Sequence, residues 1–238
     1  MPEKVVGILG GMGPEATVDF YAKVIALTPA KSDQNHLRII IDNNPKIPDR
    51  TEAILTKDKS LFPVLLETAK NLERSGVDFI AIPCNTVHYF YDDLVKHISI
   101  PILHMIREVV YTVKASLPGC KKVGLLATTG TVTSNLYQRE FQKLGIEVIV
   151  PEPQHQAEVM GAVLRIKANH EKDRAREELI KVANLLIEHE AEALILGCTD
   201  IPLVIKMGDF PVPVLDSNRV LAEATVKFAT SSESISQQ

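Results

Sequence analysis

Hydrophobic and polar positions follow two periods along this chain. Short apolar runs rich in β-branched residues predict strands at 4–9, 37–42, 78–83, 101–104, 122–127, 146–151, 193–197 and 213–215. Between these runs, apolar residues recur every three or four positions, which predicts helices at 14–27, 61–75, 89–97, 105–116, 131–144, 156–168, 174–190 and 218–229. Strands that alternate with helices are typical of repeated βαβ units. We therefore expect an α/β protein with parallel sheets and helices on both faces of each sheet.

Three sequence blocks occur twice, in the same order and at a nearly constant separation. The pairs are VGIL with VGLL (6–9, 123–126), IAIPCNT with LILGCT (80–86, 194–199) and IPIL with VPVL (100–103, 212–215). This duplication predicts two pseudo-symmetric lobes, flavodoxin-like or Rossmann-like, each with a roughly four-stranded parallel sheet flanked by helices. We expect residues 1–104 plus 215–238 to form the first lobe and residues 105–214 to form the second.

Composition narrows the class of partner. The chain has 238 residues, of which 45% are hydrophobic and 24% are charged, as in an ordinary globular protein with a substantial core. A formal net charge of −4 and the lack of a basic run argue against nucleic acid and anionic membranes as partners. The first predicted strand leaves no room for a signal peptide, and three cysteines without framework spacing fit a reducing compartment. We predict a cytoplasmic protein acting on a small molecule, with a disordered Ser/Gln-rich end at 230–238.

Four motifs fall where an open α/β sheet binds its ligands, beyond the carboxyl ends of its strands. They are Cys84, Cys198, the glycine-rich turn at 10–13 and the threonine-rich turn at 128–131. Because the two cysteines occupy equivalent positions of the repeat, we expect one thiol from each lobe to face the other across a cleft. Two opposed thiols suit the movement of a proton from one face of a carbon to the other.

Each cysteine also has a simpler interpretation. Cys84 precedes a predicted helix, whose amides and dipole favour a thiolate, but a buried inert thiol fits the same position. Asn85 and Thr86 are preferred helix-capping residues and need no other role. Two inert thiols would have no reason to occupy equivalent positions of the repeat. We therefore prefer a functional role for the pair. Cys120 has no counterpart and is interpreted as incidental, and His88 either tunes Cys84 or lies on a helix surface.

The glycine-rich turn has two interpretations. Residues 11–16 satisfy G-x-G-x-x-A at a helix start, and a dinucleotide site would use Asp42 to bind a ribose. Asp42 lies further from the glycine-rich turn than the acidic residue of a dinucleotide site usually does. Such a site would also leave both cysteines without a role. We prefer a turn whose amides meet a substrate carboxylate.

The Pro- and Asx-rich loop at 42–50 is long enough for a lid over the same rim. Arg50, at its end, is a candidate carboxylate clamp, because guanidinium pairs with carboxylate bidentately; the alternative is a solvated arginine. Lys167 is a second cation, near the end of a predicted helix of the other lobe. Without the other motifs it would be interpreted as a surface lysine. The histidines and cysteines lack metal-ligand spacing, so no metal is expected.

The motifs together resemble the cofactor-independent aspartate/glutamate racemase superfamily, and within it the aspartate racemase branch. The matching stretches occur in the family's order over both lobes: GILGGMGPEAT (7–17), NNPKIPDRT (43–51), IPCNTVH (82–88), LLATTGT (125–131) and LGCTDIP (196–202). Glutamate racemases are similar at CNT and GCT. They begin with Asp-Ser-Gly, however, and place histidine after GCT, where this chain has Gly-Gly-Met and Asp200.

The resemblance implies that Cys84 and Cys198 are the acid/base thiols. Through it, substrate binding is assigned to Met12, Arg50, Asn85, Thr86, Thr129, Lys167 and Thr199. Asn85, Thr86 and Thr199 would hold the α-carboxylate, and the two cations would bind carboxylate oxygens. The resemblance further implies activity without pyridoxal phosphate or any other cofactor, and a homodimer.

The predicted function is the interconversion of L- and D-aspartate by two-base proton transfer at the α-carbon. Alternatives within the superfamily are a glutamate-preferring or broad-specificity racemase, a decarboxylase, and a cis–trans isomerase of a dicarboxylate. Two further alternatives are a redox-responsive dicarboxylate-binding protein that forms a Cys84–Cys198 disulfide, and a nicotinamide enzyme.

Overall fold

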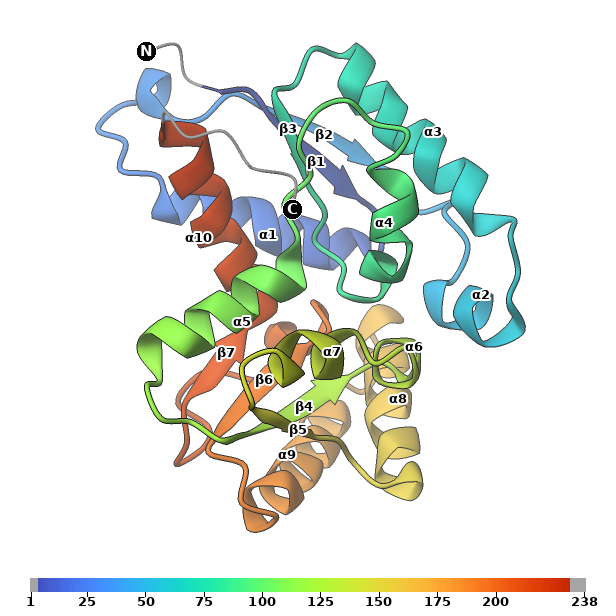
Figure 1. Cartoon of the computed structure of the whole chain (residues 1–238), viewed down its shortest axis with the longest axis vertical. Coiled ribbons are helices and arrows are strands. Elements are labelled where there is room, and N and C mark those ends of the chain that lie inside the picture. The colour runs from blue at the N-terminus through green and yellow to red at the C-terminus, as the bar shows by residue number, and fades with distance from the viewer. Residues whose placement is uncertain (1–3, 232–238) are drawn as a thin grey trace.

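The computed structural model describes residues 4–231, in two lobes that each surround a parallel sheet (Figure 1). The first sheet has the order β2-β1-β3, built from β1 (Val6–Gly10), β2 (Ile39–Asn43) and β3 (Phe79–Ala81). The second has the order β5-β4-β6-β7, built from β4 (Lys122–Ala127), β5 (Glu147–Ile149), β6 (Ala193–Gly197) and β7 (Val214–Asp216). All the strand pairs are parallel, which confirms the expected α/β class. Disorder was expected over 230–238; Thr230 instead ends a helix (Ser217–Thr230), and 232–238 lie outside the described residues.

The first sheet is one strand shorter than expected. The predicted strand at 101–104 is reduced to a single bridge between Ile80 and Ile102. Backbone hydrogen bonds of 2.9 Å still join Ile80 to Pro101 and Leu103. Pro83 stands where the second lobe has Gly197, and proline cannot donate to a strand ladder. The strand β3 therefore ends early, and the neighbouring segment 101–104 pairs with it only at one bridge.

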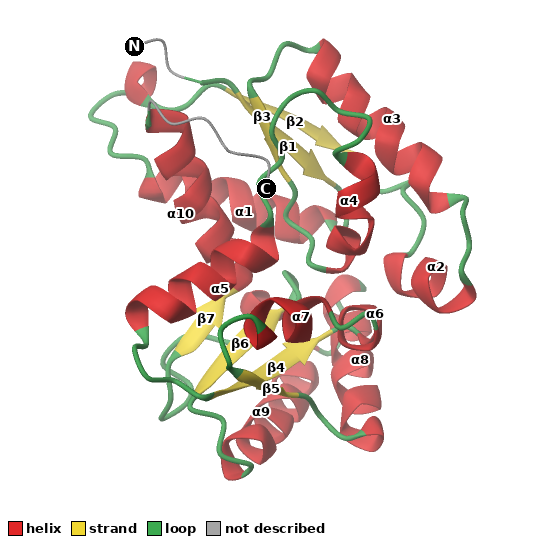
Figure 2. Ribbon diagram, in the orientation of Figure 1, coloured by secondary structure: helices red, strands yellow, loops and turns green. Residues whose placement is uncertain are grey.

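Six long helices cover the sheets, close to the predicted ranges (Figure 2). They are α1 (Pro14–Leu27), α3 (Leu61–Arg74), α5 (Met105–Ser116), α8 (Pro153–Lys167), α9 (Lys172–Glu188) and α10 (Ser217–Thr230). Between them lie the short helices α2 (Arg50–Thr56), α4 (Tyr91–Leu94), α6 (Thr129–Thr133) and α7 (Leu136–Gln142), with 3-10 turns at Asp33–Asn35, Thr86–Phe90 and Ile201–Leu203.

Two of the predicted helices are divided. The region predicted as 89–97 consists of a 3-10 turn followed by the single turn of α4. The region predicted as 131–144 is split into α6 and α7 by Asn135, whose φ of 55° is left-handed. Asparagine tolerates this conformation better than most residues do, so it ends a helix that the apolar pattern alone would continue.

The helix α10 returns to the first lobe and packs against α1 and α5. Its buried Leu221 and Val226 belong to one apolar cluster with Val6 and Ile8 of β1. Burying a side chain of this size contributes roughly 1.5–3 kcal/mol, so the contact ties the end of the chain to its beginning. The division into residues 1–104 plus 215–238 and residues 105–214 stays a prediction.

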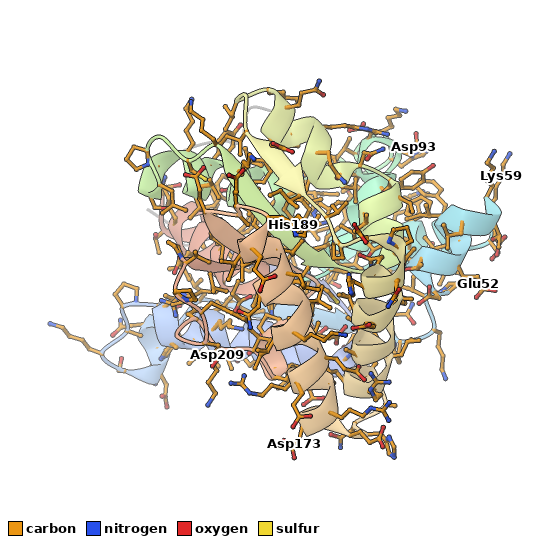
Figure 3. All side chains as sticks on the ribbon, turned by 90° about the horizontal axis from the view of Figure 1, so that it is seen from below. Glu52, Lys59, Asp93, Asp173, His189 and Asp209 are labelled. Carbon is orange, nitrogen blue, oxygen red and sulfur yellow. The ribbon has the colours of Figure 1, made fainter. Side chains whose placement is uncertain are left out.

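Charged side chains lie around the outside of the molecule. Lys59, Asp93 and Asp173 are exposed and point outward (Figure 3). Within residues 4–231, no helix combines the length and the apolar character needed to cross a bilayer.

Candidate active site

A largely enclosed cavity lies between the lobes, where the carboxyl ends of the strands meet. It is lined by Met12, Asp49, Arg50, Thr51, Cys84, Asn85 and Thr86 of the first lobe and by Thr128, Met160, Leu164, Lys167, Cys198, Thr199 and Asp200 of the second. The space open to the centre of a water molecule is ≈ 20 Å³. A single ordered water needs about 10–15 Å³ on this measure. In this arrangement of the lobes the space is therefore no larger than one or two water molecules need.

The loop after β3 carries Cys84 and is held from behind by His88. The Cys84 side chain is only 5% exposed, and His88 Nδ1 lies 2.8 Å from the Cys84 carbonyl oxygen. The Met105 amide donates to His88 Nε2 at 3.1 Å, so the ring proton must be on Nδ1. Burial lowers the pKa of His88 to about 4, which keeps it neutral. His88 thus supports the backbone of the Cys84 loop and does not lie on a helix surface.

The loop after β6 carries Cys198 beside a buried carboxylate. The Cys198 thiol donates to Asp200 Oδ2 at 3.6 Å, and Asp200 is 2% exposed. Burial first, and the negative charge of Asp200 second, raise the pKa of Cys198 above its usual range, against the opposite effect of Lys167. These surroundings therefore favour the thiol form of Cys198 over the thiolate. Desolvation outweighs any nearby helix dipole.

Lys167 lines the cavity from an exposed position, with 27% of its side chain exposed. Its Nζ lies 3.3 Å from Asp200 Oδ2. Burial acts to lower the pKa of Lys167, but the charges of Asp200 and of Cys198 outweigh it, so the pKa is raised and the ammonium stays charged. The second lobe therefore offers a cation that is held at the cavity by an acidic partner.

Arg50 brings a cation from the first lobe. Its Nη1 donates to the carbonyl oxygens of Ile47 and Pro48 at 3.2 and 3.0 Å, and its Nη2 donates to that of Met12 at 3.3 Å. Its Nε is buried without a hydrogen-bond partner among residues 4–231. A buried cation with only neutral partners is costly, so the arrangement suits an anionic ligand.

A cluster of three threonine hydroxyl groups joins the lobes at the cavity. Thr86 Oγ1 lies 2.8 Å from Thr128 Oγ1 and 3.0 Å from Thr131 Oγ1, and the latter two are 3.0 Å apart. Thr199 Oγ1 crosses the same boundary to donate to the Pro83 carbonyl oxygen at 3.2 Å. These contacts hold the closed arrangement and leave hydroxyl oxygens at the edge of the cavity.

The predicted site residues come together with one exception. Met12, Arg50, Cys84, Asn85, Thr86, Lys167, Cys198 and Thr199 line the cavity, whereas Thr129 does not. Thr128 takes that place, and Thr129 Oγ1 instead accepts from Gln156 Nε2 at 3.5 Å. The difference is one residue, because Thr128 caps α6 and turns inward to meet Thr131.

The glycine-rich turn differs from the expectation in one detail. Gly11 has a φ of +93°, and an added Cβ would lie 2.4 Å from the backbone of Asn44, so only glycine fits. The Gly11 amide donates to Thr17 Oγ1 at 3.0 Å and is therefore already occupied. The turn contributes Met12 to the lining, but its Gly11 amide does not serve a substrate carboxylate.

Sequence reasoning missed several lining residues. Asp200 was noted only as a departure from glutamate racemases, although its acidic side chain two positions after Cys198 is a usable signal. Met160 and Leu164, which were missed, recur at helical spacing with the predicted Lys167 along α8, a pattern that places them on one face. The loop at 42–50 leads into α2, whose start is signalled by Asp49, which accepts from the Glu52 amide at 2.9 Å. The described residues contain no group of ligands that would hold a metal.

Comparison with known proteins identifies relatives of this arrangement. Residues 9–225 match the family model for Asp/Glu/hydantoin racemases. The broad-specificity amino-acid racemase RacX of Bacillus subtilis strain 168 is 33% identical over 227 residues, 93% of this chain and 96% of that protein. The glutamate racemase of Aquifex pyrophilus is 29% identical over 224 residues, 85% of this chain and 79% of that protein.

Solved structures agree with these matches. A Picrophilus torridus aspartate racemase superposes with a TM-score of 0.86 at 37% sequence identity, covering 95% of this chain and 94% of that one. An aspartate racemase homologue from Pyrococcus horikoshii OT3 superposes with a TM-score of 0.76 at 28% identity, covering 96% and 100%. The chain therefore belongs to the Asp/Glu/hydantoin racemase family and is an isomerase of the cofactor-independent amino-acid racemase type.

Proposed function

We propose that this racemase interconverts L- and D-aspartate by two-base proton transfer between Cys84 and Cys198. The observation that carries the proposal is that both thiols, from equivalent strand ends, line one enclosed cavity together with Arg50 and Lys167. Two bases that approach one carbon from opposite lobes can invert it without a cofactor. Two cations suit a substrate with two carboxylates.

In the proposed step, one sulfur removes the α-proton as a thiolate and the other donates its proton to the opposite face of the carbanion. The pair shares one proton, so its titration belongs to both sulfurs. Because burial and Asp200 favour the protonated form of Cys198, we expect Cys198 to act as the acid for one of the two enantiomers. For the opposite enantiomer the roles are reversed.

The main difficulty is the weak acidity of the α-proton. Arg50, Lys167 and the hydroxyl groups of Thr86 and Thr199 would stabilise the negative charge that develops at the carboxylate. The closed cavity, with room for little water, strengthens each of these interactions. In this proposal the two lobes separate at the cavity to admit the substrate.

A second candidate is a racemase of broad specificity. The match to RacX supports it, and so do Met160 and Leu164, apolar side chains in the lining that suit an uncharged substrate side chain. A glutamate preference is a further alternative in the same family. A homodimer and a cytoplasmic location, expected from the sequence, stay predictions.

The deciding experiment is incubation of the purified, reduced protein with L-aspartate in D2O, without added cofactor. NMR follows the α-proton, and chiral chromatography detects D-aspartate. Both signals are expected, and a panel of other amino acids ranks the substrates. Ligand binding without exchange for any amino acid would instead support the redox-responsive binding protein.

Single variants test the two-thiol step. Cys84→Ala and Cys198→Ala should each abolish racemisation, while one of them retains α-proton exchange with a single enantiomer. Cys120→Ala is the matched control, because Cys120 lies away from the cavity. Near-normal racemisation in either of the first two variants would refute the mechanism.

A further inference from the structure

A relay of three buried hydrogen bonds runs through Asn85. The Tyr137 hydroxyl donates to Asn85 Oδ1 at 2.6 Å, Asn85 Nδ2 donates to Ser217 Oγ at 2.9 Å, and Ser217 Oγ donates to the Leu196 carbonyl oxygen at 2.7 Å. Tyr137 and Ser217 are fully buried, and neither lines the cavity, whereas Asn85 does. The relay starts on α7, passes through the residue after Cys84, and ends on β6, two residues before Cys198.

The Leu196 carbonyl favours one direction for the bonds of this relay. A carbonyl oxygen can only accept, so the Ser217 hydroxyl donates its proton to it and offers an acceptor to Asn85. In this arrangement Asn85 Nδ2 faces the Ser217 oxygen and Asn85 Oδ1 faces the Tyr137 hydroxyl, which also lies within hydrogen-bonding reach of Ser217. Burial raises the pKa of Tyr137, so the phenol keeps its proton and remains a donor.

A flipped Asn85 amide would be unfavourable. It would place Oδ1 against the Ser217 oxygen, whose proton is already used by Leu196. Two acceptors would then face each other in a buried site, which leaves both without a donor. Tyr137 and Ser217 therefore favour the orientation of the amide that the structure has.

We infer that Tyr137 is a positioning residue for this racemase, acting through Asn85. In the orientation it imposes, the second Nδ2–H of Asn85 has no protein partner among the described residues and remains a donor for an anionic group in the cavity. On the proposed function, that group is the substrate α-carboxylate. The inference rests on that function for the identity of the ligand, while the geometry of the relay does not depend on it.

The test compares three variants. Tyr137→Phe keeps the ring but removes the donor to Oδ1, and Ser217→Ala removes the hydroxyl that faces Nδ2. The matched control is Tyr91→Phe, which loses a hydrogen bond of 3.0 Å to the Ile102 carbonyl oxygen and lies outside the cavity lining. For each variant, kcat and KM for aspartate, the thermal midpoint, and the calorimetric affinity for succinate are measured. Succinate reports on carboxylate binding without turnover.

We expect Tyr137→Phe and Ser217→Ala each to lower kcat/KM by about tenfold to 100-fold and to weaken succinate binding, whereas Tyr91→Phe stays within about twofold. Because both act on one amide, the double variant should lose little more than either single variant. Losses that multiply, or a Tyr137→Phe variant that matches the control in kcat/KM and affinity, would overturn the inference. If Tyr137→Phe lowers the thermal midpoint far more than the control does, Ser217→Ala decides.

The failure of the inference and that of the proposed function are distinguishable. A wild type that racemises no aspartate, yet loses succinate affinity on Tyr137→Phe, would refute the function and retain the positioning role. A wild type that racemises aspartate with no effect of Tyr137→Phe would retain the function and refute the role.

Discussion

Acidification should destabilise this protein through His88. The ring is 3% exposed and fixed between the Cys84 carbonyl and the Met105 amide. Burial is the main cause that lowers its pKa from 6.5 to about 4, and the positive charge of Arg107 acts in the same direction. Between these two values the unfolded chain binds a proton that the folded protein does not. Stability is therefore complete above about pH 6.5 and is lost as the pH falls towards 4.

The size of the effect follows from this difference in pKa. One pKa unit corresponds to 1.36 kcal/mol, so the whole difference is worth about 3 kcal/mol, of which about 2 kcal/mol is lost by pH 5. His104 lies beside His88, and burial first and His88 second lower its pKa to about 2. It adds a loss of similar size, giving about 4 kcal/mol for the pair. Since a domain has only about 5–15 kcal/mol in total, this loss is readily measured.

The assay is urea unfolding, followed by circular dichroism at pH 7, 6 and 5. His88→Gln is the informative variant, because glutamine does not titrate and can still accept from the Met105 amide. The variant should be less stable than the wild type at pH 7 but should lose about 2 kcal/mol less on acidification to pH 5. If the free energies of unfolding of both proteins fall in parallel, His88 is not the group responsible and the reasoning is refuted.

Three further variants test other features. Asp200→Asn should lower the pH at which Cys198 ionises, because it removes a negative charge that opposes the thiolate. The test is the rate of alkylation of Cys198 against pH in a Cys84→Ala, Cys120→Ala background. An unchanged midpoint would contradict the prediction. Arg50→Lys keeps the charge but not the planar fork held by Met12, so KM for aspartate should rise about tenfold or more. Gly11→Ala should lower the free energy of unfolding by more than about 1 kcal/mol. Gly76→Ala is its control, since Gly76 also has a positive φ, of +78°, but no atom within 4 Å of an added Cβ; equal losses would exclude a steric effect.

The strands and long helices were predictable because their signals are local. A buried parallel strand such as β4 reads as a continuous apolar run, and a helix such as α3 shows its buried face every three or four residues. The sequence duplication further predicted that the chain forms two similar lobes. Together these signals predicted that both cysteines lie at the carboxyl ends of the strands, without any knowledge of tertiary contacts.

The missed features depend on single residues or on distant contacts. Asn135 divides a predicted helix through one left-handed residue, and α2 is too short for its period to stand out from the loop before it. Tyr137 reads as an ordinary core aromatic, since its hydroxyl meets Asn85 across 52 positions of sequence. Only the folded chain brings such groups together, so no spacing in the sequence predicts them.

The duplication predicts two equivalent thiols, yet the structure makes them chemically different. The repeat aligns Asp200, two residues after Cys198, with Thr86, two residues after Cys84. Thr86 is neutral and bonded to other threonines, whereas Asp200 is a buried carboxylate 3.6 Å from the Cys198 sulfur. Burial first, and the Asp200 carboxylate second, disfavour a thiolate at Cys198, against the opposite effect of Lys167. The two-base step that we propose needs one acid and one base at its start. The equivalent strand ends bring both thiols to one cavity, and burial together with the unmatched Asp200 makes Cys198 the candidate acid of the proposed step.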